Sequence, residues 1–410
     1  MKNIRVFVGF LVLMNVLVAA IAQQCGPNDP CPDNMCCSQF GRCGCDSACG
    51  AGCQGQCNWC QGGGGGGDGG ANDIGVNYGR VANNLPQPDQ VVNLIKSLQF
   101  KRVKIFDTDR TVLRAFANSG IRLTVAVTNQ EFSSIARSSN AASDWVRNRI
   151  APIYPATNVE FIAVGNEVLS DPGLPWPDLV PSMWNLRNAL NSLGFNQIKV
   201  TTPIATDILK ESFPPSAGEF RSDNGRDSVV NSLLGFLSST NSVFMANVYT
   251  FFAWQGNPRD ISLEYALFQS NDVKVWDGGK GYTNLFDAMV DAIYSAMERK
   301  GYGNLPLAIG ESGWPSGGAP GATVENAKAF NSRLIRRTRS GVGTPRKPGG
   351  LAAWVFALFN ENQKGGPELE RHFGLLYPNG SPVYPLQRPR HPIVREDAGN
   401  NSSSLLHSAA

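Results

Sequence analysis

Three glutamates stand just after apolar runs of the chain. Glu167, Glu311 and Glu361 each follow such a run within three residues, behind Gly-Asn, Gly and Asn respectively. Two carboxyl groups from separate strands can hydrolyse a glycosidic bond, because one protonates the leaving oxygen while the other attacks the anomeric carbon or activates water. One such glutamate alone would be read as a solvated or salt-bridged surface residue. Three of them, with Trp314 beside one, favour a catalytic pair.

Composition argues against several other chemistries. The 410 residues include only three histidines, His372, His391 and His407, and the last two lie in the polar C-terminal stretch. A histidine-based triad or a histidine-rich metal site is therefore nearly excluded, and we expect neither a metal nor another cofactor. Lysine and arginine number 36 against 33 acidic residues, which predicts no nucleic-acid partner.

The positions of these glutamates depend on a repeating pattern of strands and helices. Eight short runs rich in Val and Ile alternate with longer amphipathic segments, and continuous apolar runs are typical of parallel strands buried on both faces. Eight such units over about 310 residues predict an α/β fold, a (β/α)₈ TIM barrel over residues 73–387, with its chemistry at the C-terminal strand ends. A doubly wound open sheet is the alternative. The predicted strands are 74–78, 102–106, 123–127, 159–164, 198–203, 243–249, 307–309 and 353–359, and the main predicted helices are 89–98, 111–118, 180–193, 229–237, 285–299 and 323–339.

Several motifs of the large segment resemble one known family. Gly-Glu-Ser-Gly-Trp-Pro-Ser at 310–316 resembles the nucleophile motif of the plant β-1,3-glucanases, glycoside hydrolase family seventeen. The resemblance extends from residue 74 to about residue 386 and implies a barrel with a retaining mechanism. Further motifs follow in the same order: GVNYG at 75–79, FIAVGNE at 161–167, NVY at 247–249, FNENQK at 359–364 and ERHFGL at 370–375.

The resemblance implies roles for individual residues. Glu311 would be the nucleophile, Glu167 the acid/base, and Asn166 a donor to the sugar hydroxyl beside the anomeric carbon. Retention predicts carboxyl groups about 5–5.5 Å apart, and the charge of Glu311 would raise the pKa of Glu167. The other predicted substrate-binding residues are Tyr78, Tyr249, Glu361, Lys364 and Glu370. Lys364 is expected to be a partner of the acids that holds them ionised and oriented. Core packing is the alternative for the two tyrosines, and a structural ion-pair network is the alternative for the three charged residues.

Two further groups of side chains carry local predictions. Phe251, Phe252 and Trp254 are expected in a loop after the sixth strand, lining a groove for sugars. Asp107 and Asp109 follow the second strand and precede a predicted helix, so we expect them to cap it.

The N-terminal part of the chain has a different composition. All ten cysteines lie between Cys25 and Cys60. Residues 1–22 have a basic start, an apolar stretch and an Ala-Ile-Ala end, which predicts a secretory signal peptide rather than a membrane anchor. A disulfide-rich module at 23–61 suits that oxidising route. Residues 62–72 form a Gly-rich linker, and the tail at 388–410 is expected to be disordered.

The cysteine module resembles a hevein-type chitin-binding domain. The match rests on the cysteine spacing and on Cys-Cys-Ser-Gln-Phe-Gly at 36–41, and it implies that Ser38 and Phe40 contact chitin. Arg42 and Ala48 stand where that family has aromatic residues, so we expect weak binding. A disulfide-bonded spacer without a ligand and a zinc site remain the alternatives.

Together these features predict a secreted, monomeric endo-β-1,3-glucanase of the cell wall or the vacuole. Its partners would be β-1,3-glucan and, through the cysteine module, chitin, with no membrane association after removal of the signal. A hydrolase of mixed-linkage β-1,3;1,4-glucan and a non-catalytic wall-binding lectin are the alternatives.

Overall fold

The computed structural model describes residues 72–385 and two short strands of the cysteine module. These strands, β1 (Cys36–Cys37) and β2 (Cys43–Gly44), pair antiparallel. By its internal contacts the chain divides into two units, Met1–Gly69 and Gly70–Ala410. The predictions for the signal peptide, most of the cysteine module with Ser38 and Phe40, nearly all of the linker and the tail lie outside the described residues.

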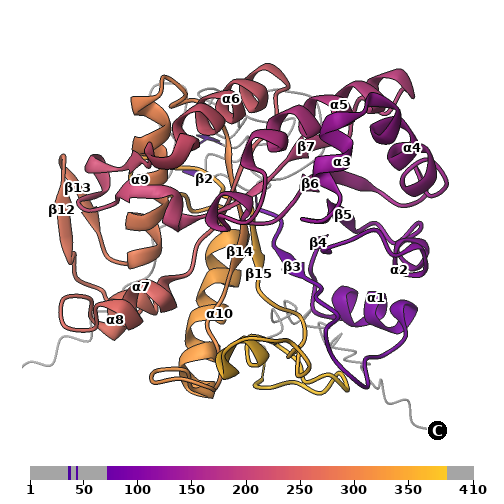
Figure 1. Ribbon diagram of the computed structural model, residues 1–410. Helices are drawn as coiled ribbons and strands as arrows, with labels where there is room; N and C mark the ends of the chain where they lie inside the picture. Colours follow the sequence, from indigo (N-terminus) through magenta and orange to yellow (C-terminus); the bar gives the residue numbers. More distant parts are fainter. Residues whose placement is uncertain (1–35, 38–42, 45–71, 386–410) are drawn as a thin grey trace, which may run out of the picture. The chain divides into compact units, whose positions relative to one another are not determined.

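The second unit is a barrel of parallel strands surrounded by helices, as Figure 1 shows. Its strands are β3 (Gly75–Asn77), β4 (Arg102–Lys104), β5 (Arg122–Val127), β6 (Val159–Val164), β7 (Lys199–Thr201), β8 (Pro203–Ala205), β11 (Phe244–Asn247), β14 (Leu307–Ser312) and β15 (Ala353–Val355). They follow the order β7-β6-β5-β4-β3-β15-β14-β11-β8. Since only Thr202 separates β7, which pairs with β6, from β8, which pairs with β11, the two are halves of one strand. The sheet therefore closes with eight strand positions, which confirms the TIM barrel and shows that the open-sheet alternative is wrong.

The inside of the barrel is filled near one end by bulky side chains. Phe161, Met245, Ala308 and Trp354 form a buried cluster separate from the main core. Neighbouring residues of a strand face opposite sides, so Trp354 points inward while the residues on either side of it join the main core. A Cβ on Gly75 would lie 2.3 Å from the Trp354 ring, so only glycine leaves room for this indole.

Two residues further along the strands, the inward positions become polar. In β3 and β4, Gly75 pairs with Arg102, and Asn77 pairs with Lys104. Both Asn77 and Lys104 are almost completely buried. The barrel thus has a mostly apolar layer, in which the Arg102 guanidinium lies over the Trp354 ring, followed by a polar layer nearer the C-terminal strand ends, where the chemistry of such barrels is located.

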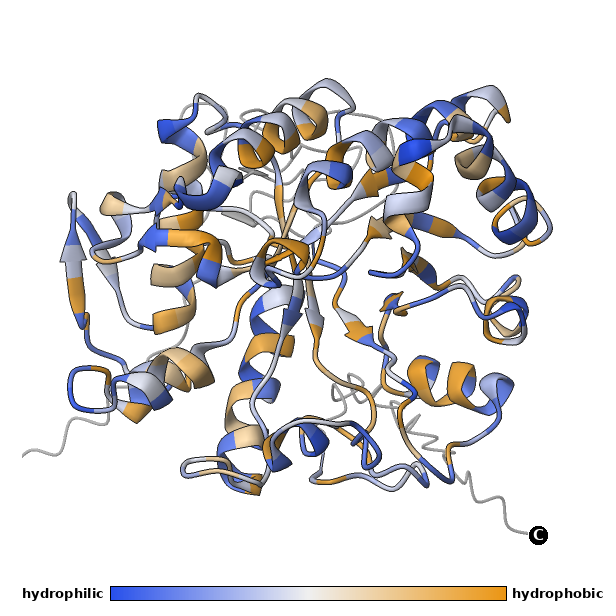
Figure 2. Cartoon of the chain, viewed as in Figure 1, coloured by the Kyte–Doolittle hydropathy of each residue, from blue (hydrophilic) through white to orange (hydrophobic). Residues whose placement is uncertain are grey.

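The six predicted helices are present, and their apolar faces pack in the core (Figure 2). They are α1 (Pro88–Ser97), α2 (Arg110–Ala115), α5 (Leu179–Ser192), α6 (Arg226–Ser239), α9 (Leu285–Arg299) and α10 (Val324–Arg339). The helix α9 is buried nearly all round, including its polar residues Asp287, Asp291 and Ser295. The capping prediction for Asp109 is confirmed, because its side chain accepts hydrogen bonds from the N–H groups of Thr111 and Val112 at the start of α2. Asp107 instead forms an ion pair with Arg80 and accepts the Asp109 N–H.

Several elements were not predicted from the sequence. The additional α-helices are α3 (Phe132–Arg137), α4 (Ser139–Arg149), α7 (Thr250–Gly256) and α8 (Leu263–Ala266). Two antiparallel hairpins add β9 (Leu209–Glu211) with β10 (Glu219–Phe220) and β12 (Val275–Asp277) with β13 (Lys280–Tyr282). The 3₁₀ turns are η3 (Val168–Ser170), η4 (Trp176–Asp178), η5 (Thr206–Ile208), η6 (Pro215–Ala217), η7 (Asp223–Gly225) and η8 (Glu368–Arg371). Within the described part of the chain, no helix has the length and apolar character needed to span a membrane.

Candidate active site

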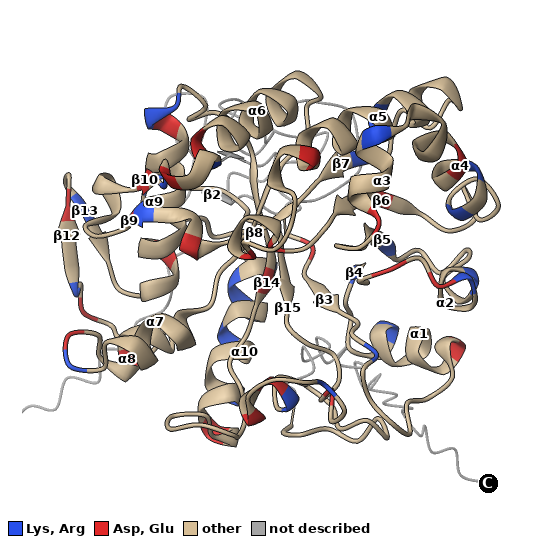
Figure 3. Ribbon diagram, viewed as in Figure 1, with Lys and Arg blue, Asp and Glu red and all other residues tan. Residues whose placement is uncertain are grey.

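A large cleft opens where the barrel strands end, and it contains both catalytic candidates. Its volume is about 1530 Å³, and Glu167 and Glu311 are among its lining residues. Glu311 is the penultimate residue of β14, whereas Glu167 comes three residues after the end of β6. In Figure 3, acidic segments lie in the middle of the barrel near β14 and β8.

A tight turn after β6 presents Glu167. Gly165 and Glu167 both have positive φ values, 62° and 52°. A Cβ on Gly165 would meet the Val168 side chain at 2.3 Å, so this turn requires glycine. Asn129 fixes the turn, because its Oδ1 accepts the Asn166 N–H at 2.7 Å and its Nδ2 donates to the Asn166 carbonyl at 3.1 Å.

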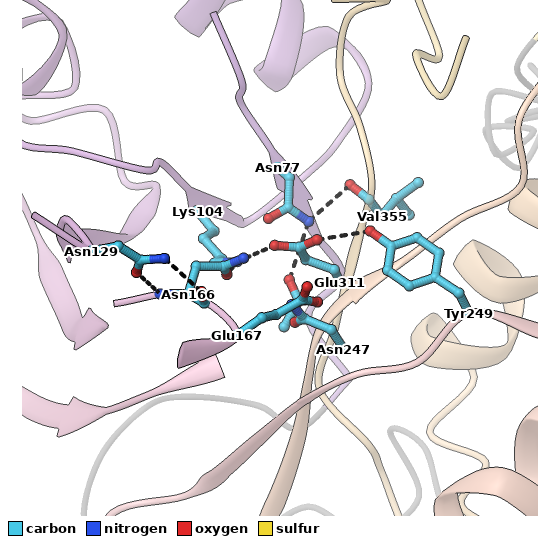
Figure 4. A network of polar contacts seen from close by, with 10 residues as sticks. Asn77, Lys104, Asn129, Asn166, Glu167, Asn247, Tyr249, Glu311 and Val355 are labelled. Atoms are coloured by element: carbon cyan, nitrogen blue, oxygen red, sulfur yellow. Dashed lines mark hydrogen bonds and ion pairs between the residues drawn. The ribbon is translucent and has the colours of Figure 1, made fainter. Parts of the chain in front are cut away.

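Glu311 is held by a lysine and a tyrosine from two other strand ends (Figure 4). Its Oε1 lies 2.5 Å from Lys104 Nζ, and its Oε2 accepts a hydrogen bond of 2.7 Å from the Tyr249 hydroxyl. The side chains of Lys104 and Glu311 are only 1% and 7% exposed. Lys104 also donates to Asn166 Oδ1 at 3.2 Å, so one ammonium group contacts both the Glu311 carboxylate and the residue before Glu167.

Glu167 has a different environment. Its Oε1 accepts a hydrogen bond of 2.8 Å from Asn247 Nδ2. Burial raises the pKa of Glu167, the charge of Glu311 raises it further, and Asn247 and Lys104 oppose the shift. One ion-paired carboxylate and one carboxyl group with a raised pKa in the same cleft are the two groups that a nucleophile and a proton donor require.

Tyr249 and Tyr78 both line the cleft, but they contact different groups. The hydroxyl of Tyr249 is a donor to Glu311, and burial together with the charge of Glu311 holds the pKa of Tyr249 well above its usual value. Tyr78 packs against the Phe359 ring at 5.9 Å, and the Arg80 guanidinium lies over its ring. Burial also raises the pKa of Tyr78, so both tyrosines keep their protons at ordinary pH.

The three charged residues predicted near the cleft all line it. Lys364 pairs with Glu370 at 2.9 Å, and its ammonium lies 4.9 Å from the Phe356 ring centre. Glu361 accepts the Val81 N–H at 3.0 Å. The cation that contacts Glu311 is therefore Lys104, and Lys364 is the partner of Glu370. Whether these three side chains bind substrate stays a prediction.

The prediction of an aromatic loop after the sixth strand is wrong. Residues 250–256 form α7, and Phe251 is fully buried with its ring centre 5.0 Å from that of Trp314. Trp254 packs against Trp314 as well, at 5.7 Å. Phe252 alone among the three predicted aromatics lines the cleft, where it is 41% exposed. Residues three apart share one face of a helix, so Phe251 and Trp254 both contact Trp314 while Phe252 points to the cleft.

Sequence reasoning missed Lys104, Asn129 and Asn247 as individual site residues. Lys104 sits inside the apolar run that became β4, and a lysine in a strand buried on both faces is the signal that could have identified it. Asn247 lies in a recognised motif but was given no role of its own. In the described part of the chain, no group of three or more His, Cys, Asp or Glu side chains is arranged to hold a metal ion.

This combination of fold and site defines a class of enzyme. The chain forms a (β/α)₈ barrel, and one cleft of this barrel contains an ion-paired glutamate and a second glutamate whose pKa is raised. This arrangement is typical of a glycoside hydrolase. The chain belongs to the glycosyl hydrolases family 17, whose family model matches residues 74–388.

Relatives and solved structures agree with this family. The chain is 44% identical over 315 residues to a probable glucan endo-1,3-beta-glucosidase of Arabidopsis thaliana, covering 76% of this chain and 90% of that protein. It is 42% identical over 316 residues to a glucan endo-1,3-beta-glucosidase of Pisum sativum, covering 76% and 84%. The structure of a beta-1,3-glucanase and pollen allergen of Cryptomeria japonica matches with a TM-score of 0.74 at 47% identity, covering 77% of this chain and 98% of that one.

Proposed function

We propose that this protein is a secreted, retaining endo-β-1,3-glucanase with Glu311 as nucleophile and Glu167 as acid/base. The observation that carries the proposal is the contrast between the two carboxyl groups. Glu311 faces a buried ammonium group, whereas burial and the charge of Glu311 raise the pKa of Glu167. The names of its relatives support β-1,3-glucan as the substrate.

In the first step, Glu311 attacks the anomeric carbon while Glu167 donates its proton to the leaving glycosidic oxygen. The bond between sugar and oxygen breaks, and a covalent glycosyl–Glu311 ester forms. Esterification removes the negative charge of Glu311, so the pKa of Glu167 falls and Glu167 becomes a base. Glu167 then takes a proton from water, which attacks the anomeric carbon and releases Glu311 with retained configuration.

The test measures reducing-end release from a soluble linear β-1,3-glucan by wild type, Glu311→Gln and Glu167→Gln. Glu325→Gln, an exposed residue of α10, is the matched control. We expect each catalytic variant to lose at least about 10³-fold, equal to about 4 kcal/mol of transition-state stabilisation, and the control to keep its rate. Proton NMR of the first product should show the β-anomer. Initial formation of the α-anomer would refute retention, and full activity of Glu311→Gln would refute the nucleophile assignment.

The alternatives differ in measurable ways. A mixed-linkage enzyme would release oligosaccharides from β-1,3;1,4-glucan faster than from linear β-1,3-glucan, and linkage analysis of the products separates the two. A lectin would bind glucan without releasing reducing ends. The size distribution of early products tests endo action, and size-exclusion chromatography tests the expected monomer.

Proposals for the N-terminal unit rest on sequence alone. Secretion predicts that the mature chain starts at residue 23, which N-terminal sequencing of the exported protein would test, and fractionation would distinguish cell wall from vacuole. Weak chitin binding through Ser38 and Phe40 predicts partial retention on insoluble chitin. Complete recovery of the protein in the supernatant would argue for a spacer without a ligand.

A further inference from the structure

The cleft has an exposed aromatic ring on a part of the fold that the catalytic network does not use. Phe213 is 67% exposed and lines the cleft. It lies between β9 and η6, whereas the residues of Figure 4 come from the barrel strands and the segments directly after them. In Figure 3, β9 and β10 lie beside α9 and the hairpin of β12 and β13, at the left of the view.

The segment that carries Phe213 is fastened at its start. Glu211 Oε1 accepts the backbone N–H groups of Ser212 at 2.9 Å and of Phe213 at 3.0 Å. These two bonds hold the pKa of Glu211 below its usual value. Pro214 and Pro215 follow directly, and their rings fix the next two φ angles.

The same segment is fastened at its end to two other elements. Asp277 of β12 accepts the Ser216 N–H at 2.6 Å and its hydroxyl at 2.7 Å. Arg299 of α9 donates to the carbonyls of Ser216 and Gly218, both at 3.0 Å. A Cβ on Gly218 would lie 2.0 Å from the Ala292 carbonyl oxygen, so the backbone here packs directly on α9. Phe213 is thus exposed on a fixed segment.

The cleft that Phe213 lines also offers apolar side chains that suit the apolar face of a sugar ring. Leu209, Ile261, Val275 and Met289 line the cleft together with it. Charged lining residues come both from the loops after β3 and β15, as Arg80 and Lys364 do, and from the segments of these apolar residues, as Asp207, Asp260 and Lys274 do. The cleft volume of about 1530 Å³ exceeds the roughly 300–1,000 Å³ that a small-molecule ligand needs. There is therefore room for a chain of several sugars that extends beyond the two catalytic glutamates.

We infer that Phe213 is the stacking platform of a distal sugar-binding subsite, which makes the enzyme prefer long glucan chains over short ones. The inference rests on the proposed glucanase function for the identity of the sugar. An aromatic face in such a position contributes about 0.5–1.5 kcal/mol, which corresponds to about 2- to 13-fold in kcat/KM.

The test compares kcat/KM of Phe213→Ala for a β-1,3-linked heptasaccharide and for the trisaccharide. We expect a loss of about fivefold for the heptasaccharide and an unchanged trisaccharide rate, with Phe213→Trp retaining both. Trp276→Ala is the matched control. Trp276 is 71% exposed on β12, but its strand neighbour Val275 lines the cleft, so the indole faces the opposite side of the hairpin.

An unchanged heptasaccharide rate, an equal loss on both substrates, or the same selective loss in Trp276→Ala would overturn the inference. If wild type cleaves neither oligosaccharide, the proposed function fails, and equilibrium binding still tests the platform. Calorimetry with Glu311→Gln, with and without Phe213→Ala, should then show weaker binding of the β-1,3- or β-1,4-linked heptasaccharide when the ring is absent. Equal binding with and without the ring, or no binding of either sugar, would overturn it.

Discussion

Replacing Lys104 with methionine removes the only cation that contacts the Glu311 carboxylate within the described structure. Lys104 Nζ lies 2.5 Å from Oε1, and the two side chains are only 1% and 7% exposed, so the charges are poorly screened by solvent. Two unit charges about 4 Å apart attract by about 4 kcal/mol at an effective dielectric constant near 20. The Tyr249 hydroxyl bond remains and offsets part of this loss.

Loss of the ammonium group leaves the Glu311 carboxylate without the contact that holds its Oε1 in place. We therefore expect the kcat of Lys104→Met to fall by about 10- to 150-fold, the equivalent of a charge-assisted hydrogen bond of about 1.5–3 kcal/mol. Lys104 also opposes the raised pKa of Glu167, so the basic limb of the kcat/KM profile should move to higher pH. The assay is a pH–rate profile with a soluble β-1,3-glucan.

Two control variants separate electrostatics from structural damage. Lys104→Arg keeps the charge and should keep the basic limb, and Lys364→Met removes a cleft lysine that pairs with Glu370 instead. Lys104→Met should also lower the free energy of unfolding by about 3–5 kcal/mol, because it leaves a buried charge unpaired. Adding Glu311→Gln should restore much of that stability. A folded Lys104→Met whose kcat and basic limb coincide with those of wild type would refute the reasoning.

Three other substitutions have expected outcomes. Tyr249→Phe removes the donor to Glu311 Oε2. We expect kcat to fall by about 10- to 150-fold, which is the equivalent of a charge-assisted hydrogen bond of about 1.5–3 kcal/mol. An unchanged kcat would show that this bond does not matter to the reaction. Asn247→Ala removes a hydrogen bond that lowers the pKa of Glu167, so this pKa should rise. Because the acid must be protonated to act, the basic limb of the pH–rate profile should move to higher pH. A downward shift of that limb would contradict the role of Glu167 as the acid. Burial raises the pKa of Asp287 from 3.8 to about 6 despite its ion pair with an arginine. The folded pKa of Asp287 lies above the unfolded one, so protonated Asp287 favours the folded state. This contribution to the free energy of unfolding, about 3 kcal/mol, is fully present below pH 3.8 and is lost as pH rises through about 6. Asp287→Asn should remove this part of the pH dependence in denaturant unfolding measured from pH 4 to 8, and identical slopes for wild type and variant would disprove it.

The sequence by itself determined the barrel and the positions of both candidate catalytic glutamates along the chain. All eight predicted strands are present, and β6 and α9 have the predicted bounds. Burial on both faces makes parallel strands read as continuous apolar runs, and this pattern is local in sequence. The missed helix α4 shows the limit of such patterns, because it is rich in Ser, Asn and Arg and buries only Ala142, Trp145 and Val146.

The tertiary structure alone decided which side chains meet. Lys104 and Glu311 are separated by 207 residues, and their ion pair exists because β4 and β14 both point polar side chains into one closed barrel. The tertiary structure also decided which aromatic side chains lie in the cleft. The helix α7 buries Phe251 and leaves Phe252 in the cleft, and two distant elements hold the segment of Phe213. Local periodicity follows from the backbone and can be read from sequence. Contacts between distant residues depend on how the barrel closes and on which side chains then share one buried space.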